Sequence, residues 1–146
     1  MVNTPYEIEI QVFCKNVVEK LSPRSIILYG SMATGKFGAG SDINIIVISE
    51  NLPENFLERL RELFELNTTT APIEPLGYKP SEFLKMIMKR HPTALYAVSD
   101  GKPLYDDGFF AEARKLFEAV KNKFDIVRIE HGWEARRLTS KIKNES

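Results

Sequence analysis

The sequence of 146 residues has one cysteine, two histidines and no net charge, because 20 basic residues balance 20 acidic ones. One cysteine, Cys14, excludes an internal disulfide and a zinc site made of cysteines alone. Neither His91 nor His131 has metal-ligand spacing to a second histidine or to the cysteine. The balanced charge produces no overall field that would attract a polyanion, so nucleic-acid binding would need a local basic patch.

Long hydrophobic runs are also missing, and no stretch is apolar for long enough to span a bilayer. The first eleven residues include Glu7 and Glu9, where a signal peptide would need an apolar segment. We therefore expect a cytoplasmic protein without a membrane association. The length suits a single domain over residues 1–146, with its core at about 4–90 and a helical extension at about 108–143.

Apolar periodicity and β-branched content predict an α-β-turn-β-α-β order followed by C-terminal helices, which is an α+β fold with a small mixed sheet. Thr4 is the expected cap of the first helix, with Glu7 completing a capping box. The expected elements are a helix over 5–21, a strand Ser25–Tyr29, a loop over 31–41 with one helical turn, a strand Asp42–Ile48, a helix over 52–66, a strand Thr68–Glu74, a helix from Pro80, a weaker segment Pro92–Val98, a short strand Lys102–Tyr105, and helices Phe109–Val120 and Ile126–Leu138.

Two of the predicted helices carry an apolar stripe that we expect to face the core. Aromatic residues towards the C-terminus read as core or as a subunit interface, which leaves a homo-oligomer open. The inward-facing residues predicted for the two helices are Ile8, Val12, Val17 and Leu21 in the first, and Phe56, Leu60, Leu63 and Phe64 in the second.

One group of residues has the composition of a phosphate and metal site. Gly30 and Ser31 follow a buried strand, a glycine-rich loop comes next, and Asp42-Ile43-Asn44 opens the following strand. Side chains alternate along a strand, so Asp42 and Asn44 point to the same side. Magnesium prefers such oxygen ligands. Gly30 allows backbone to approach a phosphate closely, and Ser31 adds a hydroxyl and an amide.

Glu74 and Lys36 each admit two interpretations. Glu74, at the end of the predicted strand Thr68–Glu74, is either a third acidic metal ligand or a solvated residue at a strand end, where Pro75 would stop pairing. Lys36 either reaches a phosphate as a point charge or is a solvated loop lysine. The sequence alone leaves both alternatives open.

Tyr29-Gly30-Ser31, followed after ten residues by Ser41-Asp42-Ile43-Asn44 and an apolar run, resembles the motif of DNA polymerase β-type nucleotidyltransferases, in particular the minimal nucleotidyltransferases. The resemblance covers about residues 26–74. It implies a metal-dependent enzyme that transfers a nucleoside monophosphate from a nucleoside triphosphate to a hydroxyl acceptor, with Mg²⁺ or Mn²⁺ as cofactor. It implies Asp42 as a catalytic metal ligand, Asn44 as a weaker one, Glu74 in the place of the third carboxylate, and Gly30 and Ser31 as nucleotide contacts. Lys36 and Ser41, in and beside the loop, are further candidate nucleotide contacts.

Two positions depart from that family pattern. Met32 stands where many minimal members have arginine, and Asn44 replaces the second aspartate. Asparagine offers a carbonyl oxygen without a charge, so the metal site is one negative charge short. An alternative function follows: a nucleotide-binding or regulatory module that has lost transfer. Minimal nucleotidyltransferases are similar to antitoxins, which would make a helical protein its partner.

Overall fold

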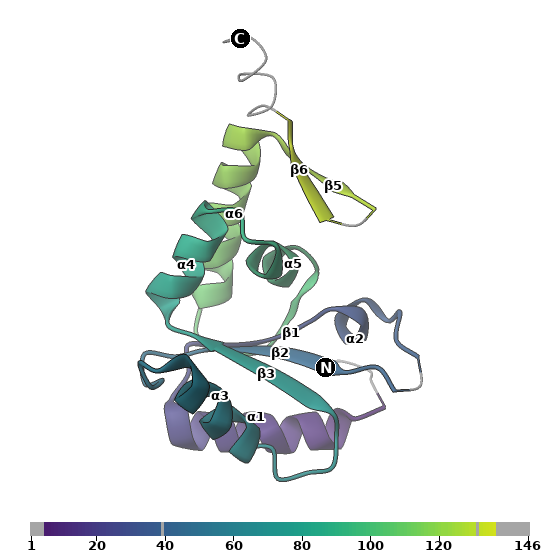
Figure 1. The fold of residues 1–146 in the computed structure, drawn as a ribbon, viewed down its shortest axis with the longest axis vertical. Helices are drawn as coiled ribbons and strands as arrows, with labels where there is room; N and C mark the ends of the chain where they lie inside the picture. The colour runs from purple at the N-terminus through teal and green to yellow at the C-terminus, as the bar shows by residue number, and fades with distance from the viewer. Residues whose placement is uncertain (1–4, 39, 131, 137–146) are drawn as a thin grey trace.

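In the computed structural model, which describes residues 5–38, 40–130 and 132–136, four strands form one mixed sheet in the order β3-β2-β1-β4 (Figure 1). Strands β2 and β3 are parallel, and the other pairs are antiparallel. The elements are α1 (Glu7–Leu21), β1 (Ser25–Tyr29), α2 (Ser31–Thr34), β2 (Ile43–Ile48), α3 (Phe56–Glu65), β3 (Ile73–Tyr78), α4 (Pro80–Met88), α5 (Pro92–Asp100), β4 (Lys102–Asp106), α6 (Phe109–Phe124), β5 (Ile126–Ile129) and β6 (Gly132–Ala135).

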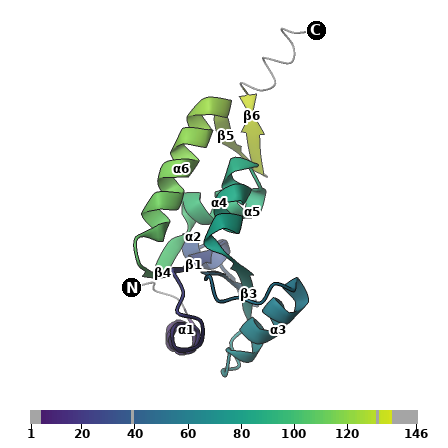
Figure 2. The ribbon, with the colours of Figure 1, turned by 90° about the vertical axis from the view of Figure 1, so that its left-hand side faces the viewer.

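Helices cover both faces of this sheet, which confirms the predicted α+β fold. Figures 1 and 2 show α1 and α3 on one face and α4, α5 and α6 on the other. Alternate residues of β1 and β2 supply the two cores: Ile26 and Ile45 pack with α1, whereas Ile27 and Ile46 pack with α4 to α6. The central strands are therefore apolar on both sides, as their continuous hydrophobic runs predicted.

The first helix differs from its prediction in start and in orientation. It begins at Glu7 with Tyr6 as its N-cap, and no side chain caps it; Thr4 lies outside the described residues. Val17 and Leu21 of the predicted stripe are buried as expected, whereas Ile8 is 72% exposed and Ile10 and Phe13 complete the buried face instead. Burial raises the pKa of the Cys14 thiol to about 11, so this cysteine is a protonated packing residue at neutral pH. Within the described part of the chain, no helix is long and apolar enough to cross a membrane.

The third strand lies further along the chain than predicted. It runs from Ile73 to Tyr78, so Glu74 is its second residue, and Pro75 lies within the strand. Our expectation that Pro75 ends pairing was wrong. Strand β3 is at the edge of the sheet, where one residue in two turns its N–H to the outside, so a missing donor costs nothing there.

The C-terminal segment also differs, since a hairpin replaces most of the predicted helix Ile126–Leu138. Strands β5 and β6 pair in an antiparallel ribbon, with Arg128 opposite Trp133. Asp125 adopts a left-handed conformation that ends α6. The segment after Asp125 has too few apolar residues for its sequence pattern to distinguish a helix from a strand. The hairpin is instead held by tertiary packing, in which the indole of Trp133 contacts the rings of Phe117 and Tyr96. The last residues of the predicted helix, 137–138, lie outside the described range.

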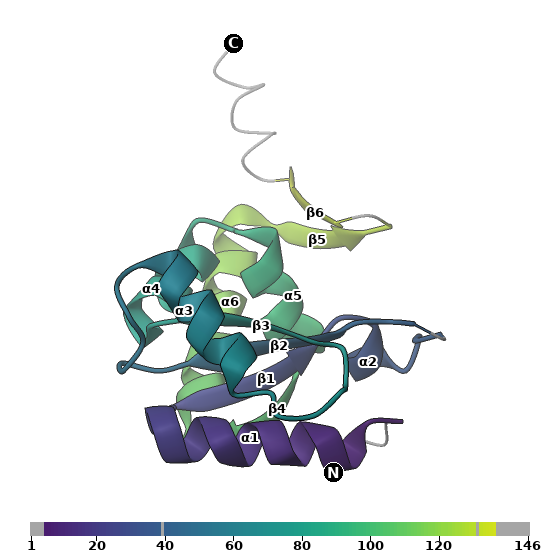
Figure 3. The same ribbon diagram turned by 60° about the horizontal axis from the view of Figure 1, so that its bottom comes forward.

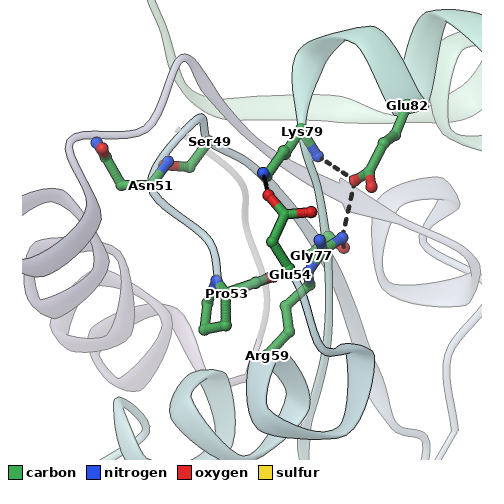
Figure 4. A network of polar contacts seen from close by, with 8 residues as sticks. All are labelled: Ser49, Asn51, Pro53, Glu54, Arg59, Gly77, Lys79 and Glu82. Atoms are coloured by element: carbon green, nitrogen blue, oxygen red, sulfur yellow. Dashed lines mark hydrogen bonds and ion pairs between the residues drawn. The ribbon is translucent and has the colours of Figure 1, made fainter.

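Arg59 is the one charged side chain that is buried among the described residues, at 3% exposure. It donates from Nε to the Pro53 carbonyl and from Nη1 to the Gly77 carbonyl and to Glu82 Oε1, at 2.9, 3.1 and 2.8 Å (Figure 4). Glu82 Oε1 also accepts from the Lys79 N–H, and the Lys79 ammonium pairs with Glu54. Arg59 thereby ties α3 to β3 and α4.

The pKa of Glu82 is lowered because its hydrogen bonds and the nearby cations together outweigh burial. Partial burial raises this pKa, but the hydrogen bonds from Arg59 and from the Lys79 N–H lower it more. A lowered folded-state pKa means that the pair stabilises the fold above the ordinary pKa of the carboxyl group. This stabilisation is lost as the pH falls through the lowered value.

Arg59→Met should destabilise the protein by about 2–4 kcal/mol, because the carbonyls of Pro53 and Gly77 and the Glu82 carboxylate lose their donor together. Urea unfolding followed by circular dichroism measures the change. Arg61→Met, at an exposed arginine of the same helix, is the matched control and should shift stability by under about 0.5 kcal/mol. Equal losses in the two variants would contradict a structural role for the Arg59 network.

Candidate functional site

The turn between β1 and α2 presents backbone groups at one end of the sheet. Gly30 has φ +79° and ψ −155°, a conformation that residues with a Cβ rarely adopt. Its carbonyl accepts from the N–H groups of Ala33 and Thr34, which closes the single helical turn predicted from the sequence. Met32 is 2% exposed and packs on the α1 side of the core. It therefore anchors α2 in the core and does not line the cleft.

Asn44 lies against this turn. Tyr29, the last residue of β1, is paired with Asn44 in β2. A Cβ built on Gly30 would lie 2.8 Å from the Asn44 amide nitrogen, so the two residues touch only because position 30 has no side chain. The glycine of the motif is therefore required both by its backbone angles and by its contact with Asn44.

Glu74 is brought next to Asn44 by the parallel pairing of β2 and β3, in which these two residues are direct partners. Asp42 comes immediately before β2, where the Ile43 N–H donates to the Pro72 carbonyl at 2.9 Å. Alternation places Asp42 on the same side as Asn44. The structure thus gathers all three predicted metal ligands where β2 and β3 begin, although Glu74 stands at the start of its strand and not at the end.

Two carboxylates and one amide form the donor set at this edge. Among the described residues, no three histidine, cysteine or acidic side chains are grouped to hold a metal. Asp42 and Glu74 are exposed, as a divalent ion that keeps several waters requires, and Asn44 contributes at most a carbonyl oxygen. The donors fit Mg²⁺ or Mn²⁺ in type but are one charge short.

Tyr29 belongs to the same row of side chains and stays neutral. Burial first, and then the proximity of Tyr78 and Glu74, raises the pKa of Tyr29 to about 12. Its phenol is therefore protonated at neutral pH and offers a hydrogen-bond donor. It is not an anionic metal ligand.

A cleft of about 630 Å³ opens beside the turn. Gly30, Ser31, Thr34 and Lys36 line one wall. Asp42, Asn44 and Glu74 are not among the lining residues, and Gly30 connects the two regions because it borders the cleft and touches Asn44. Clefts of a few hundred Å³ are of the size that holds small ligands.

The predicted nucleotide contacts fall into two groups. Gly30, Ser31 and Lys36 face the cleft, and Lys36 is exposed there. Ser41 does not line the cleft; its hydroxyl accepts from the Gly38 N–H at 2.9 Å and so shapes the loop. His91 caps α5 by accepting from the Thr93 N–H, and His131 lies outside the described residues.

The second wall of the cleft comes from residues that the sequence analysis did not select. Tyr96 and Asp100 belong to α5 and Arg128 to β5, and Figure 3 shows this hairpin above the sheet on the side where α2 lies. Arg128 Nη1 donates to Asp100 Oδ2 at 2.6 Å, and Arg128 Cζ lies 4.6 Å from the ring centroid of Tyr96. No motif connects these positions; only the packing of the hairpin brings them together.

Comparison with solved structures finds proteins that share this fold. A structure described as a toxin–antitoxin with AMP-PNP is 19% identical, and the match covers 82% of this chain and 92% of that chain with a TM-score of 0.50. A toxin–antitoxin MntA-HpeT mutant matches at 17% identity with the same coverage and a TM-score of 0.51. A tri-AMPylated Shewanella oneidensis HEPN toxin in complex with MNT antitoxin matches at 14% identity, with 82% and 92% coverage and a TM-score of 0.50.

These similarities establish the fold, and they agree with the resemblance read from Tyr29 to Asn44. A search of the curated proteins gives no significant match. The family model described as "Nucleotidyltransferase domain" matches residues 10–93, which include both the turn at Gly30 and the predicted ligands Asp42, Asn44 and Glu74. The chain therefore belongs to the nucleotidyltransferase domain family.

Proposed function

We propose that this protein binds a nucleoside triphosphate and transfers its nucleoside monophosphate to a hydroxyl acceptor in the cytoplasm. The observation that carries this proposal is the contact of Gly30 with Asn44 beside a cleft of about 630 Å³. Through that contact, a turn of the type that binds phosphate lies next to the end of the sheet where Asp42 and Glu74 are located. Nucleotidyl transfer depends mainly on positioning and on charge neutralisation, which such an arrangement supplies.

Each side chain has a distinct task in this proposal. Backbone at Gly30 and the hydroxyl of Ser31 would bind and orient phosphate oxygens, and Lys36 would add a positive charge. Asp42 and Glu74, with a weaker contribution from Asn44, would hold Mg²⁺ or Mn²⁺. When bound, such an ion supplies positive charge opposite the phosphates. Ser41 would act by shaping the loop.

A thermal-shift screen of nucleoside triphosphates with Mg²⁺ or Mn²⁺ tests this function without knowledge of the acceptor. At 100 times its Kd, a ligand adds about 2.7 kcal/mol of stability, which is roughly a 5–10 °C rise in Tm for a chain of this length. Asp42→Ala should abolish the rise, and Asn44→Asp should increase it because the missing charge returns. Release of pyrophosphate on incubation with the same nucleotides measures turnover.

Glu50→Ala provides the matched control. Glu50 is an exposed acidic residue just past the opposite end of β2, and its loss should leave the nucleotide-dependent shift unchanged. The proposal is wrong if no triphosphate shifts the Tm of either the native chain or Asn44→Asp, or if Asp42→Ala keeps the full shift.

A second function is favoured by Asn44 and by the fold neighbours described above. A site with one carboxylate fewer suits a nucleotide-binding module that regulates a helical partner, and several structurally similar proteins are toxin–antitoxin complexes. Co-expression with a helical protein encoded beside this chain, followed by size-exclusion chromatography, tests this alternative. Co-elution together with an absence of pyrophosphate release would favour regulation, whereas separate elution with measurable turnover would exclude it.

A further inference from the structure

The second wall of the cleft lies outside the segment that matches the nucleotidyltransferase domain family. That segment ends at residue 93, whereas Tyr96, Asp100 and Arg128 follow it. The cleft is thus closed by a part of this chain that the family match does not explain, and Arg128 is the basic group on that side.

Three neighbours hold the guanidinium of Arg128 in one place. Asp100 Oδ2 accepts from Nη1 at 2.6 Å, and the ring centroids of Tyr96 and Trp133 lie 4.6 and 5.1 Å from Cζ. The side chain is still 44% exposed, and it lines the cleft. An arginine carries five N–H donors in a rigid fork, and Asp100 engages Nη1, so the fork can also donate to a second anion.

The donor groups of Arg128 favour a phosphate over a nucleobase. Lys36 and Arg128 are the basic side chains among the described lining residues and come from opposite walls, whereas Asp100 and Glu130 are acidic, so the lining as a whole carries no net charge. Two aromatic rings already lie against the guanidinium, so its outer N–H groups are better placed than its faces to meet a ligand. Planar N–H groups of arginine match the oxygens of a phosphate, where they form charge-assisted hydrogen bonds.

We propose that Arg128 is a binding residue for the polyphosphate of the nucleotide, which it grips from the C-terminal hairpin while Gly30 and Ser31 hold it from the opposite wall. This inference rests on the proposed function. Asp100 would be a positioning residue, which orients the guanidinium of Arg128 and partly neutralises its charge. Arg128 would also give the phosphates a positive charge that does not depend on the metal ion, whose binding the missing carboxylate at Asn44 weakens.

Isothermal titration of the full chain with Mg²⁺ and three probes tests Arg128: ATP, inorganic tripolyphosphate and AMP. Arg128→Gln should weaken ATP and tripolyphosphate by about tenfold to a hundredfold and AMP by much less, because a charge-assisted contact to the distal phosphates is lost. Arg128→Lys should recover part of the affinity. Asp100→Asn, which keeps an acceptor but removes the charge, should tighten ATP and tripolyphosphate, which a merely structural role would not do.

Arg136→Gln is the control, since Arg136 lies next to the same hairpin and pairs with Glu134 but does not line the cleft. Its affinities should equal those of the native chain. Unchanged ATP binding in Arg128→Gln, or an equal loss for ATP and AMP, would overturn this inference while leaving the proposed function intact. A native chain that binds neither tripolyphosphate nor any nucleoside triphosphate would overturn both. Ligand-free Tm values show whether each variant is folded.

Discussion

Gly101→Ala is expected to destabilise the protein by about 3 kcal/mol or more, which corresponds to a fall in Tm of roughly 6–12 °C. A Cβ at this position would lie 2.0 Å from the Ala97 carbonyl oxygen and 2.8 Å from Ile27 Cγ2. The first contact is with backbone of α5, so no side-chain rotation relieves it, and the Gly101 N–H would lose its 3.0 Å bond to the same carbonyl. Differential scanning calorimetry measures the effect.

Gly38→Ala is the matched control for this substitution. A Cβ on Gly38 meets no described atom within 4 Å, and its backbone does not require glycine. Its Tm should stay within about 1–2 °C of the native value. If Gly101→Ala is as stable as Gly38→Ala, the steric argument is wrong, because the backbone between α5 and β4 would then have moved to accommodate the Cβ. Gly101→Ala should also distort the cleft, because Asp100 in its lining directly precedes the displaced residue.

Gly30→Ala should remove most of the nucleotide-dependent thermal shift and lower the stability of the ligand-free protein by about 1–3 kcal/mol. The backbone at φ +79° and ψ −155° disfavours a side chain, and the new Cβ would push the Asn44 amide, which lies 2.8 Å away. Movement of Asn44 disturbs the pairing with Glu74 and the position of any phosphate at the turn. The thermal-shift assay with ATP and Mg²⁺ reports both effects at once.

Two further variants separate backbone strain from the contact with Asn44. Gly35→Ala shares a φ of +79° but meets no described atom within 4 Å, so it should lose stability and largely keep the nucleotide shift. Gly30→Ala combined with Asn44→Ala should recover stability relative to Gly30→Ala alone, since the amide is removed. Loss of the nucleotide shift in Gly35→Ala to the same extent would show that the contact is not what matters.

The central strands and the turn between them were predictable because their information is local. Ser25–Tyr29 was predicted with the observed bounds, and Asp42–Ile48 began one residue early. A continuous apolar run between a glycine turn and a polar residue is compatible with few structures other than a buried strand. Strand alternation alone places Asp42 and Asn44 on one side, whereas the antiparallel pairing of β1 with β2 brings Gly30 against Asn44.

The burial of residues on a helix was less predictable, since an amphipathic pattern does not define how wide the buried face of the helix is. Phe56 and Phe64 were expected to be inward but are 45% and 50% exposed, while Arg59 is buried. Burial of an arginine becomes favourable only when carbonyls and a carboxylate from other elements converge on it. No local sequence pattern predicts that these carbonyls and this carboxylate will meet the arginine.

The sequence by itself determined the turn at Gly30, the proposed ligand positions at Asp42 and Asn44, and membership of a nucleotidyltransferase-type fold. Only the tertiary structure decided that Glu74 pairs with Asn44 and that Arg128 closes the cleft. The reason is physical: pairing register at an edge strand and the choice between helix and hairpin after Asp125 depend on long-range packing. Such packing includes Trp133 against Tyr96 and Phe117, whose free energy is absent from the local sequence.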